Sequence, residues 1–498
     1  MSQRVSVDVL VVGSGVGGAS FAAGLAPSGV KILILERGER LRDSADLRDA
    51  RAIFQRGVFR PQEEWLDGAG SGFNPGNYYY VGGNSKLYGA VLIRYRARDF
   101  APVAYAEGAT PGWPFAYEEL EPWYSRAEQL YQVRGALGCD ATEPAHSQPY
   151  LFPPVPDEPA IAVARERMKR VGLHPFPLPL GVDLEAWLAR ARTPWDAYPD
   201  AGHGKMDAES CGLAAALAHD NVDLRTGVRV ERLLLAPDGR RIAGVEALCA
   251  GERLTLSAKL VVLAAGAVNS AALLLQSGEG GLANRSDAVG RHFMNHNATA
   301  MLAVDPRARN DSVYQKTLGI NDFYLDDGKG GPPLGNIQLL GRVTAPILKA
   351  NIPFAPEWAL AALSRHSVDW YAMSEDLPNP DSRVTVAGGR IRLDWKRSNW
   401  SGHLALVAAF KQRLRAAGYP LILTQPFDRR TPSHQCGTVR IGADPATAPL
   451  DPYCRAWDHP NLFVVDASYL PTSAAVNPSL TIAAQALRVA DHVTRHDL

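Results

Sequence analysis

Features that often reveal a protein's chemistry are missing from this sequence of 498 residues. Its cysteines are Cys139, Cys211, Cys249, Cys436 and Cys454. They form no Cys-x-x-Cys pair or other tight cluster, so neither a zinc site nor an iron–sulfur cluster is indicated, and no metal is expected. Scattered cysteines of this kind are typical of reduced thiols, and we expect a cytoplasmic protein.

Long apolar runs and an excess of charge of one sign are also missing. No run reaches the roughly 18 apolar residues that a membrane helix requires, so no membrane span is expected. The 52 basic and 52 acidic residues cancel, and no basic block stands out, which argues against a nucleic-acid partner. A few polar residues at the start lead directly into an apolar run, leaving no room for a signal peptide. The length predicts about two domains.

The N-terminal region carries a glycine-rich pattern. Residues 7–12 form an apolar, β-branched run that is typical of a buried parallel strand. Gly13, Gly15 and Gly18 then match G-x-G-x-x-G, and an alanine-rich helical stretch follows at 19–25. These glycines allow a tight turn, a close approach of the backbone to a pyrophosphate, and close packing of helix on strand. The pattern predicts a dinucleotide bound at a helix N-terminus.

A second predicted strand, at 31–35, ends in Glu36. A carboxylate at this place can accept hydrogen bonds from ribose hydroxyls, whereas it would repel a 2′-phosphate. This unit does not by itself separate FAD from NAD. Farther along, residues 228–248 are predicted to form a β-hairpin. A strand at 260–264 then leads through small residues into a helix at 271–276, whose N-terminus we expect at the same crevice.

Between about 297 and 430 the pattern changes. Residues 368–374 and 383–386 have β character, and alternation around a Gly-Gly turn at 388–389 predicts a hairpin. We interpret these antiparallel strands as a separate sheet that walls a substrate pocket. An amphipathic helix is expected at 401–417.

The C-terminal region contains His434-Gln435-Cys436-Gly437-Thr438 and, farther on, Asn477-Pro478 in a small-residue loop that opens a helix. A histidine suits general-base chemistry because its ordinary pKa lies near neutrality.

Four blocks make the chain similar to the glucose–methanol–choline (GMC) oxidoreductases, flavoenzymes that oxidise alcohols or sugars. They are the N-terminal fingerprint with Glu36, the block Gly82-Gly83-Asn84-Ser85, the segment 264–270, and the C-terminal region. In the last block the matching positions are His434, Gly437, Thr438, Gly442, Asp444, Pro445, Asn461, Leu462, Asp466, Ala467, Ser468, Pro471, Thr472, Asn477, Pro478 and Thr481. Residues 300–430 are only loosely covered.

The resemblance implies an α/β fold, with a discontinuous Rossmann-like FAD-binding domain and a substrate domain built on an antiparallel sheet. Residues 1–110, 205–297 and 430–498 are assigned to the first domain, and residues 111–204 and 298–429 to the second. FAD is favoured over NAD because both chain ends and a mid-chain turn converge on one cofactor.

The resemblance also assigns roles to residues. His434 would act as the base on a substrate hydroxyl, and Asn477 would hold the same oxygen by a hydrogen bond. The implied cofactor-binding residues are Gly13, Gly15, Gly18, Glu36, Gly83, Asn84, Ser85, Val228, Ala265, Gly266, Asp466, Ala467, Asn477, Pro478 and Thr481. Members that link FAD covalently often use a histidine after the second glycine block. Lys86-Leu87-Tyr88 stand there instead, so FAD is expected to be non-covalent.

Other polar residues receive plainer interpretations. His296, although it follows the family pattern, is interpreted as structural. Glu375 and Asp376, with Arg383, are interpreted as a solvated or structural charge cluster. Cys436 is expected to be a small packed residue in a tight turn.

The leading hypothesis is oxidation of a CH–OH group of a sugar or glycoside, as in the bacterial sugar-oxidising branch of the family. The alternatives are an oxidase or dehydrogenase of a non-sugar alcohol and a non-redox lyase that retains FAD. A non-catalytic flavin-binding protein is disfavoured by the intact His434/Asn477 pair. The electron acceptor, oxygen or a carrier, and the oligomeric state are left open.

Overall fold

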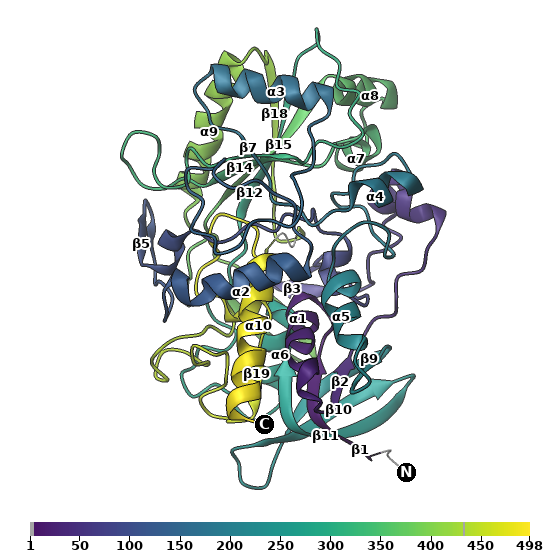
Figure 1. Cartoon of the computed structure of the whole chain (residues 1–498), viewed down its shortest axis with the longest axis vertical. Helices are drawn as coiled ribbons and strands as arrows, with labels where there is room; N and C mark the ends of the chain where they lie inside the picture. The colour runs from purple at the N-terminus through teal and green to yellow at the C-terminus, as the bar shows by residue number, and fades with distance from the viewer. Residues whose placement is uncertain (1–3, 432–433) are drawn as a thin grey trace.

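A computed structural model describes residues 4–431 and 434–498. Two large β-sheets lie toward opposite ends of the molecule, and both chain termini lie at the end that holds the seven-stranded sheet (Figure 1). This arrangement confirms the predicted α/β class with an antiparallel second sheet. The division into two domains at the proposed residue boundaries stays a prediction.

The seven-stranded sheet is the Rossmann-like part of the fold. Its strands in spatial order are β8 (Val222–Arg225), β2 (Ile32–Leu35), β1 (Arg4–Val12), β11 (Glu252–Leu263), β10 (Ile242–Cys249) and β9 (Val228–Leu235), with β19 (Leu462–Val464) also beside β11. Strands β8, β2, β1, β11 and β19 pair in parallel, whereas β10 is antiparallel to both β11 and β9, and β9 and β10 form the predicted hairpin. Strands β2 and β19 and the last four residues of β11 are buried, as expected of parallel strands covered on both faces.

Helix α1 (Val16–Leu25) and the last helix α10 (Ser479–His496) lie side by side against this sheet (Figure 1). Their approach requires small residues. A Cβ on Gly24 would lie 2.8 Å from that of Ala490, and a Cβ on Gly17 would lie 2.2 Å from the carbonyl oxygen of Val465. The first turn of the N-terminal helix is therefore packed directly on the chain that leaves β19.

The six-stranded sheet is antiparallel throughout. Its strands in order are β18 (Leu421–Pro426), β12 (Asn297–Val304), β15 (Ser367–Ser374), β14 (Asn336–Leu339), β13 (Leu318–Ile320) and β7 (Phe176–Pro177). Helices α3 (Pro159–Arg170) and α9 (Trp400–Ala416) share one hydrophobic core with this sheet, in which Trp370 packs against Phe410. Helices α7 (Ala345–Asn351) and α8 (Glu357–Arg365) flank it.

The hairpin expected around residues 388–389 and the strand expected at 368–374 both exist, but they lie in different sheets. Strands β16 (Arg383–Ala387) and β17 (Arg390–Asp394) form the hairpin, and β17 pairs with β3 (Trp65–Asp67) in a separate four-stranded sheet. The large antiparallel sheet is built on β12 and β15, in which every residue is buried. β12 was not identified from the sequence, because burial of both faces removes the alternation of apolar and polar residues.

The remaining elements connect these units. They are β4 (Gly72–Phe73), β5 (Val103–Tyr105), β6 (Gly108–Thr110), α2 (Tyr117–Leu130), α4 (Leu184–Arg190), α5 (Ala214–Leu217), α6 (Ala267–Gln276), and the short turns at Ala26–Ser28, Ala45–Arg48, Arg51–Arg56, Gly83–Lys86, Ala97–Phe100, Glu209–Leu213 and Ala467–Tyr469. Helix α6 begins four residues before its predicted start at 271, because its small residues already adopt the helical turn.

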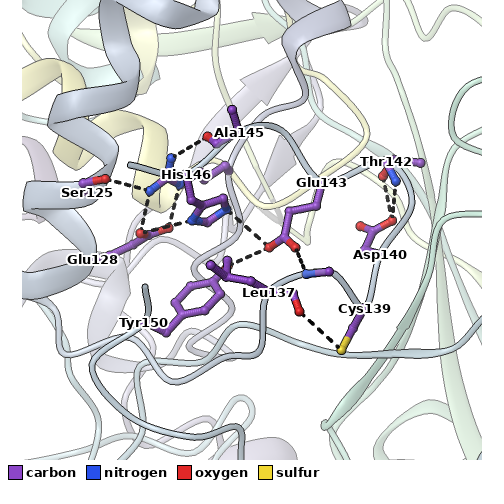
Figure 2. Close-up of polar contacts among 12 residues, drawn as sticks. Ser125, Glu128, Leu137, Cys139, Asp140, Thr142, Glu143, Ala145, His146 and Tyr150 are labelled. Atoms are coloured by element: carbon purple, nitrogen blue, oxygen red, sulfur yellow. Dashed lines mark hydrogen bonds and ion pairs between the residues drawn. The ribbon is translucent and has the colours of Figure 1, made fainter. Parts of the chain in front are cut away.

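A buried polar cluster fastens the irregular segment after α2 to that helix (Figure 2). Arg94 donates to both carboxylate oxygens of Glu128, each at 2.7 Å, and to the carbonyl oxygen of Ala145 at 3.2 Å. Glu143 accepts from the Tyr150 hydroxyl at 3.2 Å, and its other oxygen accepts from the backbone N–H of Gly138. Residues without regular structure are thus held by a charged core, since burial of the guanidinium requires such partners.

Candidate active site

The glycine-rich turn after β1 presents an uncapped helix N-terminus. Gly13 has φ +106°, and a Cβ there would lie 2.3 Å from the carbonyl oxygen of Ala264. A Cβ on Gly18 would lie 2.1 Å from the carbonyl oxygen of Gly13, whereas a Cβ on Gly15 would face open space. Gly15 is the N-cap of α1, and within the described part of the chain no side-chain hydrogen bond caps this helix. Free N–H groups at a helix start favour an anion such as pyrophosphate.

A second helix start has the same character. Gly266, the N-cap of α6, has φ +90°, and a Cβ there would also face open space. Its own N–H donates to Asp466 at 3.0 Å, and the N–H of Ala265 donates to the Ser270 hydroxyl at 3.1 Å. No side chain caps α6. Two uncapped glycine-led helices beside adjacent parallel strands fit a dinucleotide, as the sequence predicted.

Glu36 holds this crevice together. Its carboxylate accepts from the N–H and hydroxyl of Ser14 at 3.1 and 2.7 Å, and from the N–H of Gly38 at 2.9 Å. Burial raises the pKa of Glu36. The Ser14 hydroxyl in turn accepts from the N–H of Gly82, and the N–H of Val228 donates to the Glu36 carbonyl at 2.9 Å. Glu36 therefore orients the fingerprint loop in addition to its predicted role toward a ribose.

The second glycine block lies against the first. A Cβ on Gly83, whose φ is +58°, would lie 3.4 Å from the Cα of Gly15. Ser85 donates to the Gly82 carbonyl at 2.6 Å, and Asn84 accepts from the N–H of Tyr78 at 2.8 Å. The side chains of Asn84 and Ser85 thus shape this turn, and the backbone of Gly83 faces the crevice beside Gly15.

The C-terminal residues complete the crevice. Asp466 accepts from the N–H and hydroxyl of Ser468 at 2.9 and 2.6 Å and so caps the turn that begins at Ala467. Pro478 is the N-cap residue of α10. The buried hydroxyl of Thr481 bonds the Tyr124 hydroxyl at 2.7 Å, so its side chain points toward α2.

His434 and Asn477 meet as predicted. The Nδ2 of Asn477 lies 3.3 Å from the Nε2 of His434, and the Oδ1 of Asn477 accepts from Gln338 of β14 at 3.0 Å. The backbone N–H of His434 donates to Asn295 at 3.0 Å. Burial lowers the pKa of His434 well below its usual value, and the positive charge of Lys316 lowers it further. The imidazole is therefore neutral at pH 7 and can accept a proton.

His296 contacts His434, although the sequence suggested only a structural residue. The two Nδ1 atoms are 2.7 Å apart, and the Nε2 of His296 lies 2.8 Å from the carbonyl oxygen of Ser473. Burial lowers the pKa of His296 to about 4.

Two buried carboxyl groups hold the loops that carry Asn477 and His296. Glu375 accepts from the N–H groups of Ser473 and Ala474, each at 2.9 Å, and Asp376 accepts from the N–H of Asn295 at 2.9 Å. Burial raises the pKa of Glu375 to about 8 and that of Asp376 to about 6. Of the two interpretations that the sequence allowed, solvated or structural, the structural one holds for Glu375 and Asp376, because both are buried.

Sequence reasoning missed two further polar residues of this region. Gln338 touches Asn477, and its Oε1 is buried without a hydrogen-bond partner among the described residues. Lys316 raises the positive potential at His434 and donates to Asp196 at 2.8 Å. Both come from the part of the chain that the family pattern covers loosely, so no motif pointed to them.

Within residues 4–431 and 434–498, no cluster of three or more His, Cys, Asp or Glu side chains is arranged to bind a metal ion. None of the helices in the described part of the chain combines the length and apolar character needed to cross a membrane.

Comparisons with known proteins agree on one family. Models described as GMC oxidoreductase match residues 196–298 and 389–486, and a model of an NAD(P)-binding Rossmann-like domain matches residues 11–77. The chain is 31% identical to paromamine 6'-oxidase of Streptomyces fradiae, over 98% of this chain and 92% of that protein. It is 29% identical to 6'''-hydroxyparomomycin C oxidase of Streptomyces lividus, over 98% and 91% of the two chains.

Two other similarities are broader. The chain is 28% identical to 2-methyl-1,2-propanediol dehydrogenase of Mycolicibacterium austroafricanum, over 98% of this chain and 95% of that protein. Among solved structures, pyridoxine 4-oxidase from Mesorbium loti superposes with a TM-score of 0.69 at 21% identity, covering 98% of this chain and 99% of the other. At that identity the superposition shows a shared fold.

Replacement of Glu36 by glutamine is expected to weaken the binding of the dinucleotide cofactor. The amide keeps the size of the side chain but removes the charge that strengthens each hydrogen bond, at about 1.5–3 kcal/mol for a bond to a charged group. Titration of apoprotein with FAD, followed by flavin fluorescence, measures the change. Glu39→Gln, three residues away on the surface, is the matched control. Equal affinities of the two variants would show that Glu36 does not contact the cofactor.

Proposed function

Because the chain belongs to the GMC oxidoreductase family, we propose that it oxidises a CH–OH group of a sugar or glycoside with FAD as cofactor and His434 as base. The observation that carries this proposal is the contact of His434 with Asn477. Members of the family are flavoproteins, and the two uncapped helix starts at Gly15 and Gly266 fit the pyrophosphate of FAD.

His434 and Asn477 have different roles toward the substrate hydroxyl group. The Nε2 of His434 accepts the hydroxyl proton as the carbon gives up hydride, and the Nδ2 of Asn477 donates a hydrogen bond to the same oxygen. Gln338 fixes the orientation of the Asn477 amide by donating to its Oδ1. When bound, FAD supplies the flavin N5 as hydride acceptor, and the protein supplies position and charge.

Two observations favour a substrate with several hydroxyl groups. Two similar Streptomyces proteins are named as oxidases of paromamine and 6'''-hydroxyparomomycin C. In addition, the buried Oε1 of Gln338 and Oδ1 of Asn336 lack hydrogen-bond partners among the described residues. Residues two apart on a strand share a face, so both acceptors lie on one side of β14. An unpaired buried acceptor costs about 1–3 kcal/mol, which a donating hydroxyl can offset.

An anaerobic screen tests this function. Monosaccharides, glycosides and simple alcohols are each mixed with the purified protein, and bleaching of the flavin absorbance is recorded. We expect bleaching by sugars or glycosides. Bleaching only by simple diols would favour the non-sugar alternative, in line with the similar propanediol dehydrogenase. No bleaching by any alcohol would favour a non-redox lyase. Admission of oxygen, or of a dye, to the bleached protein then identifies the electron acceptor.

We further propose that FAD is bound without a covalent link. The side chains that stand where a linking histidine would be expected already have partners. Lys86 forms ion pairs with Asp207 at 2.9 Å and Glu209 at 2.8 Å, and the Tyr88 hydroxyl donates to the Met206 carbonyl. These contacts already engage the polar atoms of both side chains. The free state of all five cysteines supports the proposed cytoplasmic location.

Acid or heat denaturation is accordingly expected to release the flavin into the supernatant. The protein is precipitated, and absorbance near the flavin band is compared in the supernatant and in the redissolved pellet. Yellow colour that stays with the polypeptide would mean that another residue forms a covalent bond.

Replacement of His434 by alanine is expected to slow flavin reduction by roughly 10²–10⁴-fold while FAD remains bound, because the proton acceptor is lost. Stopped-flow reduction under anaerobic conditions measures the rate. Asn477→Ala should cost less, about 1–3 kcal/mol, the scale of one lost polar contact. His174→Ala is the control, since the His174 side chain is exposed and, among the described residues, pairs only with Asp322.

The rate should also be insensitive to acid. A base whose pKa is lowered stays neutral as the pH falls, so wild-type reduction should remain level over the range of about pH 5 to 8 in which an ordinary histidine titrates. A fall in rate through pH 6.5 would contradict the assignment of a neutral His434.

A further inference from the structure

The hydrogen bonds around His296 determine where its proton lies. The carbonyl oxygen of Ser473 can only accept, so the Nε2 of His296, 2.8 Å away, must carry hydrogen. That carbonyl is itself held in place. It accepts from the Tyr95 hydroxyl at 2.9 Å, and the backbone N–H of Ser473 is fixed by Glu375.

The other nitrogen of His296 is therefore an acceptor. Burial lowers the pKa of His296 to about 4, so the ring is neutral at pH 7 and has one hydrogen only. With that hydrogen on Nε2, the Nδ1 atom presents a lone pair. A contact of 2.7 Å between the Nδ1 atoms of His296 and His434 requires one hydrogen between them, and His434 must supply it.

The same reasoning then determines the state of His434. A neutral imidazole with hydrogen on Nδ1 has its lone pair on Nε2. The atom next to the Nε2 of His434 is a hydrogen-bond donor, as this assignment requires. Gln338 donates to the Oδ1 of Asn477, which turns the Nδ2 of Asn477, a donor, toward the Nε2 of His434 at 3.3 Å.

We propose that His296 is a positioning residue that sets the tautomer of His434, so that the Nε2 of His434 carries the lone pair that takes the substrate proton. This proposal rests on the proposed role of His434 as base. No carboxylate bonds either imidazole among the described residues. Around the pair, Lys316 lies on the side of His434, while Glu375 and Asp376 act through the backbone of Ser473 and Asn295. The neutral side chain of His296 thus orients the base His434, whereas many catalytic sites use a carboxylate for this role.

Protons are conserved when His434 takes the substrate proton. Nε2 of His434 gains the hydroxyl proton and the ring becomes an imidazolium, while its Nδ1–H continues to donate to His296. The alternative tautomer, with hydrogen already on Nε2, would present a donor to the substrate hydroxyl and could not act as base. Only an acceptor at the position of His296 Nδ1 favours the active form.

Variants of His296 test the proposal on the FAD-loaded enzyme. His296→Leu removes the acceptor, and we expect flavin reduction to slow by roughly 10- to 10³-fold with little change in the substrate concentration at half-maximal rate. His296→Gln retains one acceptor and one donor, and should recover much of the loss. The matched control is His403→Leu. His403 is equally buried and bonds Thr299 and Ser374 at 2.7 and 3.0 Å, without contact to His434.

A direct readout separates this proposal from the proposed function. In protein labelled with ¹⁵N-histidine, the His434 signals are assigned by their loss in His434→Ala. We expect the Nε2 of His434 to resonate as an unprotonated nitrogen in the wild type and to gain hydrogen in His296→Leu. A protonated Nε2 in the wild type, or equal reduction rates in wild type and His296→Leu, would overturn the proposal. So would a glutamine variant as slow as the leucine variant.

The two ideas can fail independently. If no alcohol bleaches the wild-type flavin, the proposed function is wrong, and the ¹⁵N spectrum of the wild type still decides the tautomer. If His296→Leu does not fold, the spectrum and the glutamine variant decide it.

Discussion

The close packing of helix α1 on the chain that follows β19 is the contact on which the arrangement of the site depends. Gly17 lies so near Val465 that a methyl group would overlap the carbonyl oxygen. Because this contact joins the start of the chain to its last region, it brings the glycine-rich turn and the loop of Asn477 to one crevice. A larger residue would force the backbone apart, and packed interiors resist such shifts.

On the substrate side, buried carboxyl groups hold the loops in place. Glu375 and Asp376 lie beyond the end of β15 and accept from backbone N–H groups in the loop that carries Asn477 and in the loop that carries His296. Buried carboxyl groups are costly unless they are satisfied by hydrogen bonds, so the loops are held in one conformation. The antiparallel sheet thereby fixes the position of His434 relative to a cofactor crevice built by the other sheet.

The local patterns of the sequence predicted the Rossmann-like part well. Residues 7–12 and 31–36 show a strand, a glycine turn and an acidic end within one short unit, and the structure has them there. The antiparallel sheet was predicted as a class, and the strand expected at 368–374 is its β15, but β12 was not identified. β12 is buried on both faces and lacks the alternation that would identify it. The visible alternation belonged to β16 and β17, which lie partly exposed in another sheet.

By itself, the sequence determined the chemistry available to this protein. It contains a glycine-rich turn typical of dinucleotide sites, a histidine and an asparagine in one C-terminal block, and no histidine at Lys86–Tyr88 to link a flavin. Only the tertiary structure decided that His296 contacts His434, that Gln338 holds Asn477, and that Glu375 is buried. These contacts join residues that are 98 to 139 positions apart. Neither propensity nor periodicity carries information over such separations, because both describe neighbours along one element, and the packing of sheets determines which elements meet.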